Sequence, residues 1–154
     1  MISLLIWAAL STFVPRPSAE TASIADQWYR VSVVPGKDVI IAADEHRVIL
    51  LDPRSIRREP SGLVRGSFRS ELREPRFAHG QMLRSDRKLL EIDCASLRYR
   101  VLSIRGFADP NLDHEVRLDS VDDRWTAPVV RDSTAGRPLD EACRRAGRGI
   151  SPTK

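Results

Sequence analysis

Two cysteines, Cys94 and Cys143, are the only thiols in this chain of 154 residues. In an oxidising compartment an even number of cysteines favours disulfides, and two cysteines allow a single connectivity. Such a bond closes a loop of about fifty residues. Chain-entropy reasoning predicts that this closure stabilises the folded state by roughly 4 kcal/mol. A zinc site needs two further ligands, and the three histidines lie roughly thirty residues apart, without metal-ligand spacing. The sequence therefore predicts one structural disulfide and no metal site.

Catalytic arrangements are not indicated by the remaining polar residues. Serine hydrolases present their nucleophile on a strained turn, whereas the nearest match, Ser67 after Gly66, falls inside a predicted strand. The adjacent carboxylates Asp122 and Asp123 point to opposite sides of an extended chain, so they do not form a paired-carboxylate site. Gly62 and Gly66 lack the lysine and the spacing of a phosphate-binding loop. We therefore expect a protein that binds, with no catalytic residues and no cofactor.

Binding chemistry is suggested by Arg65, Arg69 and Arg73. Alternate residues on a strand share a face, so these three form a row with steps of about 13 Å, at roughly 3.3 Å per residue. A row of this kind suits an extended polyanion such as a sulfated glycan. The alternative is that the arginines pair with Glu91 or other acids on neighbouring strands. The three arginines are candidate anion-binding residues, and the pairing alternative stays open.

An apolar run over residues 2–14 indicates export. A run of about thirteen residues suits a signal peptide and is shorter than the roughly twenty that a membrane span requires. Small residues follow it, so we expect a signal peptide over residues 1–25, cleaved between about 19 and 25. No cysteine lies near the end of this leader, so a lipoprotein anchor has no thiol to attach to. We expect a mature chain without a transmembrane segment, located in the periplasm, at the cell surface or outside the cell.

The chain is basic, with 25 Lys and Arg residues against 21 Asp and Glu residues and a formal net charge of +4. In a cytoplasmic protein this excess would favour nucleic acid as a partner. For an exported protein, the expected anionic partners are instead lipopolysaccharide, lipid headgroups, sulfated glycans or acidic protein surfaces. The plainer alternative is that the charge only keeps the surface soluble.

Strand periodicity dominates the mature chain, which forms one domain over residues 26–147 followed by a flexible tail over 148–154. Turns are expected at Pro35-Gly36 and at residues 95–97, the second closing a hairpin. A loop is expected over residues 107–113, and residues 117–125 contain one further short strand. The other strands are predicted over residues 28–34, 39–41, 47–51, 63–72, 88–94 and 99–105.

One helix is predicted near the C-terminus. Ser133 or Thr134 suits its N-cap, Pro138 suits its first turn and Gly147 suits its end. A helix of about ten residues is marginal alone. The disulfide therefore attaches this helix to the strand that ends at Cys94, which gives an α+β fold.

The order of several segments resembles the bacterial surface-adhesin protein E family. The resemblance rests on Trp28, the segments 51–56, 90–94 and 99–102, Trp125 and the segment 139–143, with similar order and spacing over nearly the whole mature chain. It implies an antiparallel sheet of about six strands packed against a C-terminal helix, with the disulfide between them. It also implies an adhesin-like protein, with a host matrix protein or an anionic glycan or lipopolysaccharide as ligand. A periplasmic interaction module is the alternative, and the oligomeric state stays open.

Overall fold

The computed structural model describes residues 28–118 and 122–148. The expected signal peptide, its cleavage site and the tail from residue 149 onward lie outside the described residues. Within them, a seven-stranded antiparallel sheet has the strand order β1-β2-β4-β5-β6-β7, and β3 pairs with β4 beside this path. The strands are β1 (Val39–Ala43), β2 (Arg47–Leu51), β3 (Arg57–Arg58), β4 (Val64–Ala78), β5 (Gln81–Asp93), β6 (Arg98–Asp109) and β7 (Asp113–Val116). The predicted α+β class is confirmed.

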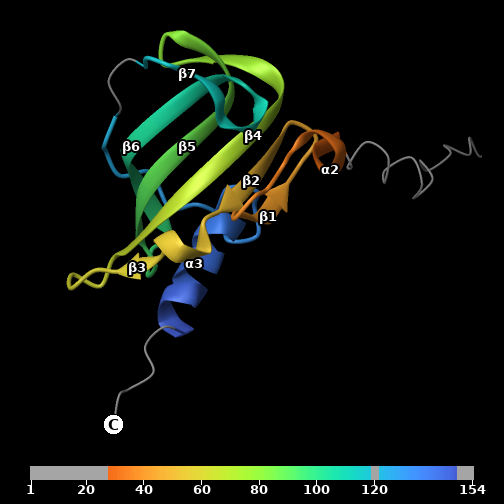
Figure 1. The fold of residues 1–154 in the computed structure, drawn as a ribbon. Coiled ribbons are helices and arrows are strands. Elements are labelled where there is room, and N and C mark those ends of the chain that lie inside the picture. Colours follow the sequence, from red (N-terminus) through yellow and green to blue (C-terminus); the bar gives the residue numbers. More distant parts are fainter. Residues whose placement is uncertain (1–27, 119–121, 149–154) are drawn as a thin grey trace, which may run out of the picture.

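Three long strands, β4 to β6, form the centre of the curled sheet, and the β4–β5 hairpin arches over one end of it (Figure 1). His79 and Gly80 both have positive φ in the turn of this hairpin, as type I′ turns require. The strand β4 is longer than the predicted segment 63–72 because a register shift between Glu71 and Arg76 lets it continue through Pro75. A proline is tolerated there because it lies at an irregularity of the ladder.

The C-terminal helix α3 (Gly136–Arg148) packs on one face of the sheet, which we call the helix face (Figure 1). Ser133 caps it, since its Oγ accepts a hydrogen bond of 3.0 Å from the Gly136 amide. The predicted helix is confirmed, and it ends one residue beyond Gly147. The hydrophobic core lies between the helix and β2, β4 and β5, and it consists of Ile49, Leu51, Val64, Phe68, Leu90, Ile92, Leu97, Leu139, Ala142 and Ala146.

The predicted disulfide is present and joins the turn after β5 to the middle of α3. The Sγ atoms of Cys94 and Cys143 are 2.02 Å apart, and their Cα atoms are 5.8 Å apart. Both cysteines pack against the main core. The bond therefore holds α3 against the strand on which its apolar side lies.

The prediction of a strand over residues 28–34 is wrong, because residues 28–32 form the short helix α2 (Trp28–Ser32). The Val33 amide donates to the Tyr29 carbonyl, and the Ser32 Oγ donates to the Trp28 carbonyl. Tyr29 and Val33 pack on the opposite face of the sheet, which we call the open face, whereas Val31 is 92% exposed. The alternating residues Tyr29, Val31 and Val33 therefore do not share one buried face.

The region after β6 also differs from the prediction. The strand β6 extends through Phe107 to Asp109, and a 3-10 helix, η2 (Pro110–Leu112), leads into β7 where a loop was expected. No strand occurs in the described part of residues 117–125. Instead, Thr126 and Val129 donate backbone hydrogen bonds to the carbonyls of Tyr99 and Leu97, so this segment runs along the edge of β6. Asp122 and Asp123, which precede it, lie exposed at the surface.

Candidate functional site

The three predicted anion-binding arginines lie in three different environments. The Arg65 side chain is partly exposed on the open face, Arg69 is buried with 4% exposure, and Arg73 is exposed beyond the end of β2. The expectation of one continuous outward row along β4 is therefore corrected at Arg69. The physical reason is that α2, the residues after it and η2 cover the middle of the open face.

Arg69 is the centre of a buried polar cluster. Its Nε donates to Glu71 Oε1 at 2.6 Å, its Nη1 to the Val34 carbonyl at 2.9 Å and its Nη2 to Asn111 Oδ1 at 2.8 Å. Burial raises the pKa of Glu71 and outweighs the opposing hydrogen bonds from Asn111 and Arg69. Nearby, Arg87 binds the carboxylate of Asp38, which is itself 5% exposed. All three nitrogens of the Arg69 guanidinium thus make hydrogen bonds that hold the fold.

Asn111 connects this cluster to the segment that follows α2. Its amide N–H donates to both carboxylate oxygens of Glu71, and its side chain bonds the backbone of Val34 and of Ser32. Its backbone is left-handed, with φ 63° and ψ 30°, a conformation that asparagine tolerates better than most residues. The sequence marked Asn111 only as a loop residue, because its partners are about 40 and 80 positions away in the chain.

The exposed arginines of the open face form a row across the strands, not along one of them. The register places Arg57 opposite Arg65, Arg65 opposite Glu91 and Glu91 opposite Arg100. Neighbouring strands are about 4.8 Å apart, so the four side chains lie close together. We call Arg57, Arg65 and Arg100 the arginine row. Three cations face two carboxylates, Glu91 and Glu59, and the Glu59 carboxylate lies 3.5 Å from Arg65, so the row keeps a net positive charge.

Glu91 holds two members of the arginine row in place. Its Oε1 accepts from Arg65 Nε and Nη2 at 3.1 and 3.0 Å, and its Oε2 accepts from Arg100 Nε at 2.7 Å. Glu91 is 3% exposed, whereas the arginine side chains are 42% and 35% exposed. Burial opposes the ionisation of Glu91, but the bonds from Arg100 and Arg65 outweigh it and hold its pKa below its ordinary value of 4.5.

Trp125 extends the arginine row on the β6 side. The guanidinium carbons of Arg98 and Arg100 lie 5.1 and 5.2 Å from the centre of its ring, within the range of cation–π interaction. This stacking limits the rotamers of Arg100 without using its hydrogen-bond donors. The row therefore combines a pre-oriented cationic surface with one aromatic side chain.

The lowered pKa of Glu91 predicts an acid-sensitive contribution to stability. Because its folded-state pKa lies below 4.5, the contribution is complete above that pH and is lost as the pH falls through the folded-state value. At pH 7, Glu91→Gln should lower the melting temperature, and its difference from the parent should shrink below pH 4.5. Melting curves at pH 7, 5, 4 and 3 test this. Glu74→Gln is the control because Glu74 is exposed, and an equal shift in both variants would contradict the assignment.

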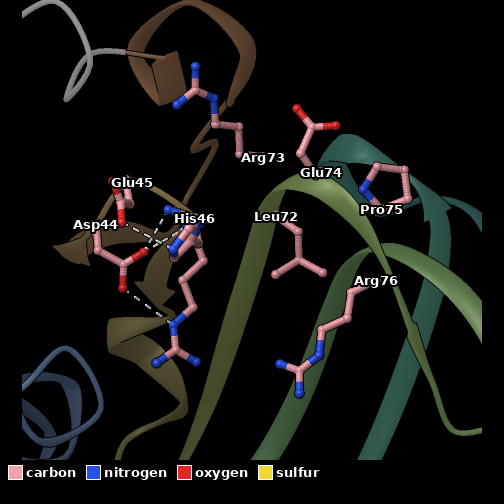
Figure 2. A pocket seen from close by; sticks show the side chains of 9 residues that line it. Asp44, Glu45, His46, Leu72, Arg73, Glu74, Pro75 and Arg76 are labelled. Carbon is pink, nitrogen blue, oxygen red and sulfur yellow. Dashed lines mark hydrogen bonds and ion pairs between the residues drawn. The ribbon is translucent and has the colours of Figure 1, made fainter.

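Arg73 lines a groove of about 660 Å³ between the turn after β1 and the bent part of β4 (Figure 2). The groove opens because β2 begins only at Arg47, and one further backbone hydrogen bond, from the Arg73 amide to the carbonyl of His46, precedes the strand. One wall carries Asp44, whose carboxylate accepts from the amides of His46 and Arg47. On the other wall, the Arg73 and Arg76 side chains point away from each other (Figure 2). Arg73 is therefore remote from the arginine row.

No group of three or more metal-ligating side chains occurs within residues 28–118 and 122–148. In the same residues, no helix is both long enough and apolar enough to cross a membrane.

The sequence matches a family model, and the fold is similar to solved structures. A family model described as surface-adhesin protein E matches residues 37–144. One structure of Haemophilus influenzae protein E has a TM-score of 0.58 and 13% sequence identity, covering 78% of this chain and 93% of that chain. A second crystal form has a TM-score of 0.60 and 12% identity, covering 75% of this chain and 94% of that chain. No curated protein matches the sequence.

Proposed function

This chain belongs to the surface-adhesin protein E family, and from that membership we propose that it is an exported, adhesin-like protein that acts by binding. We also propose a mature domain that begins after a signal peptide within residues 1–25. Family membership supports the adhesin role, and the apolar run over residues 2–14 supports export. Nothing in the described geometry supplies a nucleophile beside a base, in keeping with a role in binding.

The arginine row is the surface we assign to ligand binding. Arg57 has no ion-pairing carboxylate among the described residues, Arg65 and Arg100 share the carboxylate of Glu91, and Arg65 also lies 3.5 Å from Glu59. Arginine presents paired donors that match sulfate and carboxylate groups, and Trp125 adds an apolar surface beside them. The ligand that fits is an extended anion, such as a sulfated glycan of the host matrix or an acidic protein surface. The observation that carries the proposal is the excess of cations over carboxylates in this row.

Removing two cations from the row should weaken binding to heparin, used as the probe. We expect Arg57→Ser with Arg65→Ser to bind about 5- to 30-fold more weakly, since two exposed charge contacts contribute about 1–2 kcal/mol together. Arg30→Ser with Arg73→Ser removes the same charge from exposed positions elsewhere and should change binding little. Affinity measurements at two salt concentrations check this, because screening weakens an electrostatic contact. Equal loss in both double variants would show that net charge alone matters.

A periplasmic module that binds an envelope component is the second candidate, because the apolar run over residues 2–14 supports export equally for the periplasm and for the cell surface. Protease added to intact cells of the native host separates the two. Digestion of this protein while a periplasmic marker survives would support the adhesin. Protection of both proteins would support the periplasmic module.

A further inference from the structure

The helix face carries a second polar site, on the side of the sheet opposite the arginine row. A cavity of about 210 Å³ lies on this face, next to the main core. The register places Ser70 opposite Asp86 and Lys88 opposite Phe68, so these polar side chains share the face of the hydrophobic core. Charged side chains on a core-facing surface are costly unless they have partners or a role. The polar residues that line the cavity are Arg47, Ser70, Arg76, His79, Asp86 and Lys88.

Cations outnumber carboxylates in this cavity by three to one. Lys88 Nζ donates to Asp86 Oδ2 at 2.7 Å, and Arg47 lies 3.7 Å from Asp44, which does not line this cavity. Arg76 is exposed and has no ion-pairing carboxylate among the described residues. A smaller cavity of about 120 Å³ shares Arg47, Ser70 and Lys88 and reaches the first turn of α3.

Asp86 limits which anion fits. It is 9% exposed, and its Oδ1 is buried without a hydrogen-bond partner. A bare sulfate or phosphate would be attracted by Arg47 and Arg76 but would be repelled by the charge of the Asp86 carboxylate. A ligand that carries an anionic group at one end and neutral hydroxyl groups at the other avoids this repulsion, because its hydroxyl groups can lie beside Asp86.

We propose that this cavity binds a single acidic sugar, of the uronic or sialic acid class. The sugar carboxylate lies between Arg47 and Arg76, and its hydroxyl groups donate to Asp86 and accept from Lys88 and Ser70. Drug-sized ligands occupy pockets of about 300–1,000 Å³, so a cavity of about 210 Å³ suits one ring and not a longer glycan. Leu72 and Leu83 supply apolar walls for the ring carbons. This site is independent of the arginine row, because the two occupy opposite faces of the sheet.

Titration of the mature protein with glucuronic acid and N-acetylneuraminic acid, followed by NMR, tests the proposal. For a ligand of this size we expect a Kd on the order of 1 mM with at least one of the two acids, at about 0.3 kcal/mol per heavy atom. Glucose and sulfate serve as the neutral and inorganic probes and should each bind at least about tenfold more weakly, a difference of about 1.4 kcal/mol.

Two variants assign the binding to this cavity. Arg76→Gln should weaken binding of the acidic sugar by about fivefold or more, whereas Arg73→Gln, whose side chain points away, should not (Figure 2). Asp86→Asn, checked for folding by its melting curve, should also weaken binding of the acidic sugar.

Stronger binding of sulfate and sugar alike in Asp86→Asn would overturn the proposal in favour of a simple anion site. Absence of binding by both acids, or equal binding of glucose, would also overturn it. Unchanged sugar binding in the Arg57→Ser, Arg65→Ser variant would support it, and lost sugar binding there would overturn it.

Discussion

Replacing Cys94 and Cys143 together with serine is expected to destabilise the domain by about 2–5 kcal/mol. The disulfide closes a loop with a sequence separation of 49 residues and fixes α3 against the core. Without the bond the unfolded chain gains freedom, and a helix of 13 residues must remain docked through its apolar side alone. At about 4 °C per kcal/mol, the melting temperature should fall by roughly 8–20 °C. Calorimetry or thermal circular dichroism measures the change.

Two controls separate the cross-link from the cost of burying hydroxyl groups. The Cys94→Ala, Cys143→Ala variant removes the bond without adding polar atoms, so a similar loss in both variants assigns the effect to the cross-link. Hydrogen exchange should show α3 losing protection before β4 and β5, because it has fewer hydrogen-bonded neighbours. Titration of the denatured, unreduced parent protein should find no free thiol. Two free thiols, or unchanged exchange in α3, would contradict the structural role.

Arg69→Met should cost about 3–5 kcal/mol, because it leaves the buried carboxylate of Glu71 without its cation, whereas Asp38 keeps Arg87. Glu71 and Asp38 are 1% and 5% exposed, and Arg69 is the residue that bonds Glu71, Val34 and Asn111 at once. Arg73 lies four residues further along β4 and is exposed. Arg73→Met should therefore change the free energy of unfolding by less than about 0.5 kcal/mol. Chemical denaturation of both variants measures the difference. Heparin binding by a folded Arg69→Met variant should match the parent.

A double variant at Arg69 and Glu71 tests whether these two side chains depend on each other. Adding Glu71→Leu to Arg69→Met removes an uncompensated carboxylate, so the double variant should recover part of the lost stability. Glu71→Leu alone should be costly, since it leaves the buried guanidinium without its charged partner. Additive losses in the double variant would show that the two side chains act independently, contrary to the bond between them.

The sequence predicted the elements whose signals are local. The strands around residues 39–41, 47–51, 88–94 and 99–105 follow from apolar runs and alternation, and all lie within strands of the sheet except for Cys94, which begins the turn after β5. The cap at Ser133 and the turn after β5 follow from residue type. The pairing of Cys94 with Cys143 follows from the cysteine count, because two cysteines leave one partner each. The family, and with it the packing of helix on sheet, was recognised from the order of these segments.

Only the tertiary structure decided which arginines share a surface. The alternation of Arg65, Arg69 and Arg73 fixes the side of β4 on which they start, but not what covers that side. The segment after α2 and the loop at Asn111 bury Arg69, and Arg73 lies beyond the first residue of β2, away from the others. Arg57 and Arg100 join Arg65 because strand register brings them together across chain separations of 8 and 35 residues. Register and coverage are long-range properties, since they depend on partners that local periodicity does not specify.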